Sequence, residues 1–233
     1  FMKRVISGLF FGIILLLIAG LGMYYWVGMQ IADTIAVTSE HFSKEDEGLK
    51  FRIISHDNSL FDSTTVQEVE INPTKMSYYQ ADSKTDVAPF KLMLQHTIYH
   101  GPFAFSAPGA DPAQPVAAII ETELKPDNPF TQVLQSFTGK QKPFQARTIV
   151  HFDQSSEVEV TVAPVNYTSA DKSESIKWTG LKGQFNYNPK YQDAGFSFHA
   201  GGLSAQDQDS LVVVDGISGL FKGQLGNGSG DVT

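Results

Sequence analysis

The chain has 233 residues, a formal net charge of −8 and a pI of about 5.2. This acidic balance argues against nucleic-acid binding and against peripheral adhesion to anionic lipid, because both partners are negatively charged. The sequence contains no cysteine, which excludes a lipoprotein anchor, a thiol nucleophile, a disulfide framework and a thiolate metal site.

The first predicted element is an uncharged apolar run from residue 5 to residue 27. About 20 apolar residues in a helix span the ~30 Å hydrocarbon core of a bilayer, so residues 1–27 are expected to form a single-pass membrane anchor. Lys3 and Arg4 precede the run and favour a cytoplasmic N-terminus. Three aromatic residues at its far end are expected at the outer interface: Tyr24, Tyr25 and Trp26.

A cleaved secretory signal is the competing interpretation of this run. The basic start fits a signal, and Gly20-Leu21-Gly22 is a weak cleavage site. The apolar part of a signal is about 7–15 residues long, and this run is longer. We therefore favour a retained anchor in the bacterial inner membrane, with the rest of the chain in the periplasm.

A helical stalk is expected over residues 28–48. Ile31, Ile35 and Phe42 share one helix face, and Gly48 ends the helix. The stalk either lifts the following domain off the bilayer or pairs with a second copy, and the sequence favours the first of these.

From Leu49 the hydrophobic period changes to two, which predicts strands. A turn is expected at residues 56–58, a loop rich in proline and small residues at 106–115, and a hairpin turn at 153–156. The predicted strands cover residues 49–53, 64–71, 90–99, 116–124, 144–152, 158–162, 177–187, 195–203 and 211–221.

One short helix is predicted between the strands. Asn128 is expected to cap it, and Gly139 to end it. Four apolar residues then share one face at helical spacing and are expected to cover one end or face of the sheet: Phe130, Val133, Leu134 and Phe137.

Residues 49–233 are thus expected to form one periplasmic domain, an antiparallel twisted β-sheet or meander. Glycine next to apolar residues recurs in the last strands, as at Gly183-Gln184-Phe185, and favours regularly stacked strands. No cap is evident after the last strand, so the native protein is expected to continue beyond residue 233.

Several segments in this order resemble one family of bacterial envelope proteins. They are Phe61-Asp62-Ser63, His96-Thr97-Ile98-Tyr99-His100-Gly101-Pro102-Phe103, Pro143-Phe144, Ala163-Pro164-Val165-Asn166-Tyr167 and Gly183-Gln184-Phe185. Together with the N-terminal apolar run they are similar to the YdgA family, which has no assigned function. The segment His100, Gly101, Pro102 and Phe103 carries the most specific part of this resemblance.

The resemblance implies an inner-membrane anchor, a β-rich periplasmic domain and a native length well beyond 233 residues. The chain is also loosely similar to the AsmA-like proteins, whose curled sheets carry lipid along an apolar groove. Neither resemblance implies a catalytic residue or a cofactor.

His100 is the residue with the clearest potential for chemistry. It could act as a general base, with Gly101 allowing a substrate to approach closely. The structural interpretation, which we favour, is that Gly101 and Pro102 make a tight turn at a strand end. No Ser or Asp nearby has the spacing of a catalytic triad.

Two groups of residues resemble metal ligands. His96 and His100 would lie about 13 Å apart on a strand, too far to share a zinc ion. The acidic residues lack the loop spacing of a calcium site and are expected in solvated turns: Asp111, Glu121, Asp207, Asp209 and Asp215. We therefore predict no catalytic, cofactor or metal site.

The aromatic content leaves the function open. Phe, Tyr and Trp make up 12% of the residues, and many fall at alternating strand positions. They either fill an ordinary core or line an apolar groove for an acyl chain or a partner's strand. The sequence favours a non-enzymatic protein that binds or assembles as a homo-oligomer. The alternatives are a lipid carrier or bridge with an apolar groove, and an envelope hydrolase with His100 as base.

Overall fold

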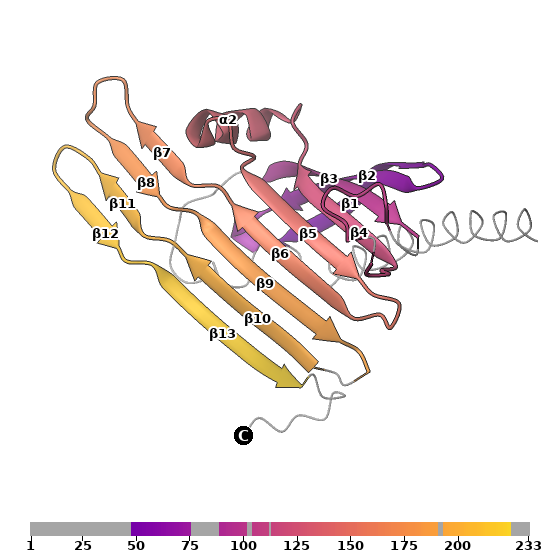
Figure 1. Ribbon diagram of the computed structural model, residues 1–233. Coiled ribbons are helices and arrows are strands. Elements are labelled where there is room, and N and C mark those ends of the chain that lie inside the picture. The colour runs from indigo at the N-terminus through magenta and orange to yellow at the C-terminus, as the bar shows by residue number, and fades with distance from the viewer. Residues whose placement is uncertain (1–47, 76–88, 102–103, 112, 191–192, 225–233) are drawn as a thin grey trace, which may run out of the picture.

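Figure 1 shows the computed structural model, which describes residues 48–75, 89–101, 104–111, 113–190 and 193–224. Within them the chain forms 13 strands in two antiparallel sheets and one α-helix, which confirms the prediction of a mainly β fold. No helix among these residues has the length and apolar character needed to cross a bilayer. The predicted anchor and the stalk up to residue 47 lie outside the described residues.

The larger sheet has nine strands in the order β1-β2-β3-β4-β5-β6-β9-β10-β13. Neighbours in this order are antiparallel throughout, and a short 3₁₀ turn (Pro73–Lys75) follows β2. The strands are β1 (Leu49–Asn58), β2 (Asp62–Ile71), β3 (Phe90–His100), β4 (Ala118–Leu124), β5 (Phe144–Val150), β6 (Ser156–Val162), β9 (Leu181–Asn188), β10 (Asp193–Ala200) and β13 (Ile217–Gln224).

The smaller sheet continues the last part of the larger one. Its order β12-β11-β8-β7 matches the order in which β13, β10, β9 and β6 lie in the nine-stranded sheet. Each strand of the smaller sheet is joined through two linking residues to one strand of the larger sheet (Figure 1). The strands are β7 (Val165–Thr168), β8 (Ser175–Trp178), β11 (Leu203–Gln206) and β12 (Leu211–Val214).

The boundary between the sheets, which we call the crease, runs across four neighbouring long strands at one level. Its linking residues are 163–164, 179–180, 201–202 and 215–216, and three of the four pairs contain glycine. Thr179 N–H donates to the carbonyl of Gly202, and Gly201 N–H donates to that of Gly180. Gly180 has a φ of 89°, a conformation that only glycine adopts without strain.

The observed strands correct the prediction at four places. The segments 177–187, 195–203 and 211–221 are not single strands, because the crease divides each of them. Residues 56–58 lie in β1 and not in a turn. An irregularity between Ile53 and Ser55 shifts the register, and pairing with β2 then resumes at Ser55.

The predicted short helix is confirmed as α2 (Pro129–Thr138). Gln132 N–H donates to the carbonyl of Asn128, and Gly139 ends the helix with a φ of 67°. The helix packs against β7 and β3, where the rings of Phe137 and Tyr167 meet edge to face with centroids 5.3 Å apart.

A small buried cluster lies beside the strands and not between two sheets. Four of its members are buried: Ala104, Ala107, Val116 and Ile119. They bring the loop between β3 and β4 against the sheet, with Tyr99 and Ile149 partly buried next to them. Among the described residues the core is therefore modest, and the sheet they form is a single layer over much of its area (Figure 1).

We predict that Gly180→Ala destabilises the fold more than Gly139→Ala does. A Cβ at Gly180 would lie 2.6 Å from the Val162 carbonyl oxygen, whereas one at Gly139 meets nothing within 4 Å. Both positions have positive φ, which costs ~1–2 kcal/mol for alanine, so the contact makes the difference. Urea unfolding followed by Trp178 fluorescence, in a Trp26→Phe background, measures it.

The glycine at position 139 thus serves as the control for backbone strain alone. Equal losses of unfolding free energy in the two variants would contradict a steric requirement at the crease.

Candidate functional site

The register of the nine-stranded sheet gathers apolar residues on one side. Directly paired residues share a face, so the pairing links Phe221 to Phe196, Phe185 and Val158 across four strands. We call this side the apolar face. One example from each strand, from β1 to β13, is Phe51, Val69, Leu92, Ile120, Phe144, Val160, Leu181, Phe196 and Ile217.

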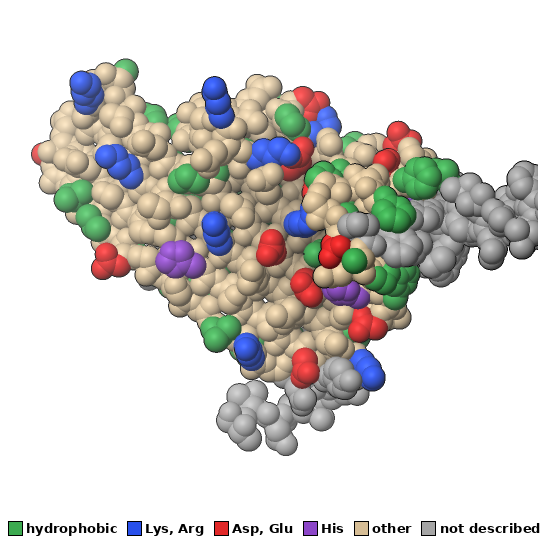
Figure 2. Space-filling model, in the orientation of Figure 1, with side chains coloured by type: hydrophobic (Ala, Val, Ile, Leu, Met, Phe, Trp, Pro, Cys, Tyr) green, Lys and Arg blue, Asp and Glu red, His purple; other side chains and the backbone are tan. Residues whose placement is uncertain are grey.

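The opposite side, which we call the polar face, carries mainly charged and amide side chains. Figure 2 looks onto this side, over which Lys, Arg, Asp and Glu side chains are scattered. One example from each strand, again from β1 to β13, is Arg52, Glu68, Lys91, Glu121, Arg147, Glu159, Gln184, Ser197 and Lys222.

Cross-strand ion pairs order the polar face. Glu68 accepts from Arg52 and from Lys91, each at 3.1 Å. The hydrogen bond from Lys91 is the main cause that holds the pKa of Glu68 below its ordinary value. Arg147 Nη1 donates to Glu121 at 2.6 Å. Because these pairs are partly solvated, they set strand register more than they add stability.

The exposed fraction of side chains on the apolar face is higher on β9, β10 and β13 than on β2 and β3. On β2 and β3, Val69 is 6% and Ile98 is 0% exposed. On β9, β10 and β13 the exposed fractions are 38% for Phe185, 43% for Phe196 and 56% for Phe221. Large apolar side chains are normally buried, so this exposure marks the second half of the face as a candidate binding surface.

Aromatic rings form the middle of this exposed half. Phe196 lies between Phe185 and Phe221 on the two neighbouring strands, and it stacks on Phe198 with centroids 5.5 Å apart. Phe198 is paired with Gly183 on one side and Gly219 on the other. A Cβ at Gly219 would lie 2.2 Å from the Phe198 ring, so the glycine leaves room for the ring to lie flat over β13.

One polar row interrupts the apolar face near its buried half. His56 Nδ1 lies 2.8 Å from Thr65 Oγ1, and His96 Nδ1 lies 2.8 Å from Thr122 Oγ1. The second nitrogen of His96 lies 3.3 Å from Gln67 Oε1. Burial lowers the pKa of His96 to about 4, so the ring is neutral at physiological pH.

The residues of the predicted family motif lie at the end of β3. The side chain of His100 is fully buried on the apolar face. The backbone N–H of His100 donates to the carbonyl of Phe61 at 3.1 Å. Gly101 has a φ of 102°, and its N–H donates to the carbonyl of Ala117. The other two motif residues and the predicted anchor residues lie outside the described residues: Pro102, Phe103, Lys3, Arg4, Tyr24, Tyr25 and Trp26.

The remaining candidates from the sequence lie apart. His96 and His100 share the apolar face of β3, four residues apart along one strand. In the part of the chain that the structure describes, no three His, Asp or Glu side chains gather as a metal site. Asp207 instead accepts from the backbone N–H groups of Asp209 and Ser210 within a turn.

A groove of about 430 Å³ lies on the polar face, beside Tyr99 and Glu159. Arg147 pairs with Glu121 in it, and Lys142 pairs with Glu123. Burial and the charge of Glu121 raise the pKa of Tyr99. Because both of its cations are already paired with carboxylates, this groove is a weaker candidate for a ligand site than the apolar face.

The alternation in the sequence predicted the residues of the apolar face. Two features of the structure were missed, namely the exposure of that face and the crease. Nothing in the sequence distinguished a covered face from an exposed one. The crease had a signal in Gly180, Gly201, Gly202 and Gly216, which lie at three of its four strand breaks.

A comparison with protein families finds one match, to a family described as bacterial protein of unknown function (DUF945), over residues 2–231. The chain belongs to the DUF945 family. No curated protein matches the chain. No solved structure matches it either. The expectation of a bacterial family without an assigned function is thus confirmed, and no activity passes to this DUF945 chain by comparison.

For this DUF945 chain we predict that stability falls as the pH drops from about 6.5 towards 4. Unfolded histidine has a pKa near 6.5, and His96 in the fold has one of about 4, so protons favour the unfolded state in that interval. The loss is complete below about pH 4 and amounts to ~3 kcal/mol. Urea unfolding across this range measures it.

His96→Gln should remove this part of the pH dependence, whereas His199→Gln should keep it. His199 is an exposed histidine on the polar face, hydrogen-bonded to Ser218. An unchanged slope in His96→Gln would show that His96 is not the titrating group.

Proposed function

We propose that the exposed half of the apolar face holds the acyl chains of lipid, so that the protein acts as a lipid carrier or bridge in the bacterial envelope. The observation that carries this proposal is the exposed row Phe185, Phe196 and Phe221 across the last three strands of the nine-stranded sheet. Acyl chains fit such a surface because they need apolar contact along a line and no polar partners.

The energies are of the right order for reversible binding. Fully burying a large apolar side chain contributes about 1.5–3 kcal/mol, and these rings are roughly half buried already. Covering the three rings and Ile217 would therefore contribute roughly 1 kcal/mol each. After the entropic cost of binding, such a sum supports weak, exchangeable contacts, which suit a carrier better than a storage site.

Two sequence features support the same proposal. The uncharged run of residues 5–27 would tether the sheet to a bilayer, the source of acyl chains. The resemblance to the YdgA family, and the looser one to the AsmA-like proteins, points to an inner-membrane envelope protein with an apolar sheet surface.

We predict that Phe196→Asp lowers the amount of bound phospholipid and that Ser197→Asp does not. The two residues are neighbours on β10 and lie on opposite faces, so both variants add the same charge to the same strand. A carboxylate on the apolar face would have to lose its water when an acyl chain binds there. Native mass spectrometry of the detergent-purified full chain measures the bound lipid mass.

The lipid proposal is wrong if wild type carries no lipid-sized mass, or if both variants carry as much as wild type. Equal unfolding midpoints of the two variants would serve as the folding control.

Homo-oligomeric assembly is a second candidate function, favoured by a different observation. All four residues of the edge strand β12 are exposed: Leu211 (63%), Val212 (54%), Val213 (63%) and Val214 (42%). Edge strands of soluble proteins normally carry charge or proline, which discourages pairing. An uncharged edge of one leucine and three β-branched valines is suited to add a strand from another copy.

If copies of the chain assemble through β12, Val213→Lys should shift the protein towards the monomer. Thr168→Lys, on the opposite edge strand β7 of the same sheet, should leave association unchanged. Sedimentation of the full chain in detergent at several concentrations measures this. A wild-type protein that stays monomeric at all concentrations would contradict the second candidate.

Enzymatic activity with His100 as base receives no support from the site. The His100 ring is fully buried, so a substrate would have to enter a closed part of the sheet to reach it. We do not propose a hydrolase.

A further inference from the structure

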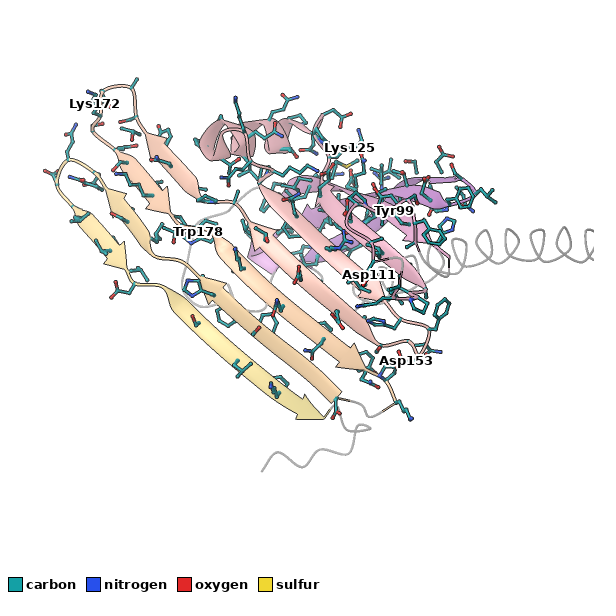
Figure 3. All side chains as sticks on the ribbon, in the orientation of Figure 1. Tyr99, Asp111, Lys125, Asp153, Lys172 and Trp178 are labelled. Atoms are coloured by element: carbon teal, nitrogen blue, oxygen red, sulfur yellow. The ribbon has the colours of Figure 1, made fainter. Side chains whose placement is uncertain are left out.

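Three segments of the chain meet at one end of the nine-stranded sheet. They are the turn 59–61 after β1, the described part of the loop after β3 (residues 101, 104–111 and 113–117) and the turn 151–155 after β5. Backbone hydrogen bonds join them in a row, from His100 N–H to Phe61 and from Ala117 N–H to Val150. Asp153 in Figure 3 marks this end, and Lys172, far away beyond the crease, marks the opposite end.

Each of these segments exposes at least one large apolar side chain, and we call the four exposed side chains together the apolar tip. They are Leu60 (38% exposed), Phe61 (47%), Phe105 (64%) and Phe152 (48%). Figure 2 shows hydrophobic side chains gathered at the same end of the molecule, on its right-hand side. The turns at the opposite end are polar instead, with Asp171, Lys172 and Asp207.

We propose that the apolar tip inserts into the surface of a zwitterionic lipid bilayer. Exposed aromatic rings carried by separate turns match the interfacial zone of a membrane, where such rings have a preferred depth. A protein partner would instead need a continuous apolar surface with a polar rim.

The sequence supplies the reason for choosing a lipid surface. The uncharged run 5–27 is the predicted anchor, and residues 28–48 separate it from β1. A tether of this length reaches at most about 70 Å when extended, at ~3.3–3.6 Å per residue. The tip would thus remain close to the same bilayer at a high effective concentration, so weak insertion by a few side chains is enough.

The charge of the tip specifies the kind of surface. The stretches 55–62, 101–117 and 151–157 contain no Lys or Arg. They contain five acidic residues: Asp57, Asp62, Asp111, Asp153 and Glu157. Anionic headgroups would repel these carboxylates, whereas zwitterionic headgroups would not. The inference does not depend on lipid carriage, because it concerns the end of the sheet and not its apolar face.

The test uses the absence of native cysteine, which permits a single fluorescent label at any chosen position. Ser59→Cys and Ser106→Cys place labels next to Phe61 and Phe105 without removing the rings. Gln208→Cys, in the β11–β12 turn, and Lys140→Cys, after α2, are the matched controls far from the tip. The labelled full chain is reconstituted into phosphatidylcholine vesicles with and without nitroxide-labelled lipid.

We expect the nitroxide lipid to quench the labels at positions 59 and 106 and to leave those at 140 and 208 unquenched. Replacing Phe61, Phe105 and Phe152 with serine should abolish the quenching. Phe105→Trp in a Trp26→Phe, Trp178→Phe background should show a blue-shifted emission in vesicles. Adding phosphatidylglycerol at low salt should reduce the quenching, and added salt should restore it.

Equal quenching at all four positions, or none at 59 and 106, would overturn the proposal. So would labels at 59 and 106 that are shielded from aqueous iodide but not quenched by lipid, since a protein would then cover the tip. The Phe196→Asp variant separates this test from lipid carriage, because it should lose bound phospholipid and keep the quenching.

Discussion

The period-two alternation of side chains, held in register over nine strands, is the constraint on which the structure depends. It places charged residues on one side of the sheet and apolar residues on the other, with little else to cover either side in the described part of the chain. Because ion pairs such as Arg52–Glu68 and Arg147–Glu121 connect neighbouring strands, a one-residue slip would place charges among the phenylalanines. The sheet is therefore well specified although its core is small.

The strength of this alternation explains which parts of the fold the sequence could predict. The strand from Phe90 to His100 and the helix ending at Gly139 were predicted almost to the residue, because local periodicity and capping determine them. The crease was not predicted, since it arises from the joint path of four paired strands. The strand character of His56 was hidden by the irregularity at Ile53, which breaks the local alternation.

The candidate site was predicted only in part for a related reason. Alternation shows that Phe185 and Phe196 are apolar-face residues, but the amount of covering material depends on contacts distant in the chain. The same pattern would result from a filled sandwich, in which a second layer covers these rings. For His100 the sequence left a general base and a strand-end turn open and favoured the turn, and the structure places the residue fully buried at the end of β3.

The order of the strands also determines how such a protein can change in length during evolution. After β6, each further long strand joins the outer edge of the sheet already present and contacts only its neighbour. Strands lie ~4.8 Å apart, so one additional hairpin would widen the apolar face by ~10 Å without altering any existing pair. A family built in this way can acquire longer or shorter surfaces by gain or loss of hairpins, while the region around β1 to β4 stays unchanged.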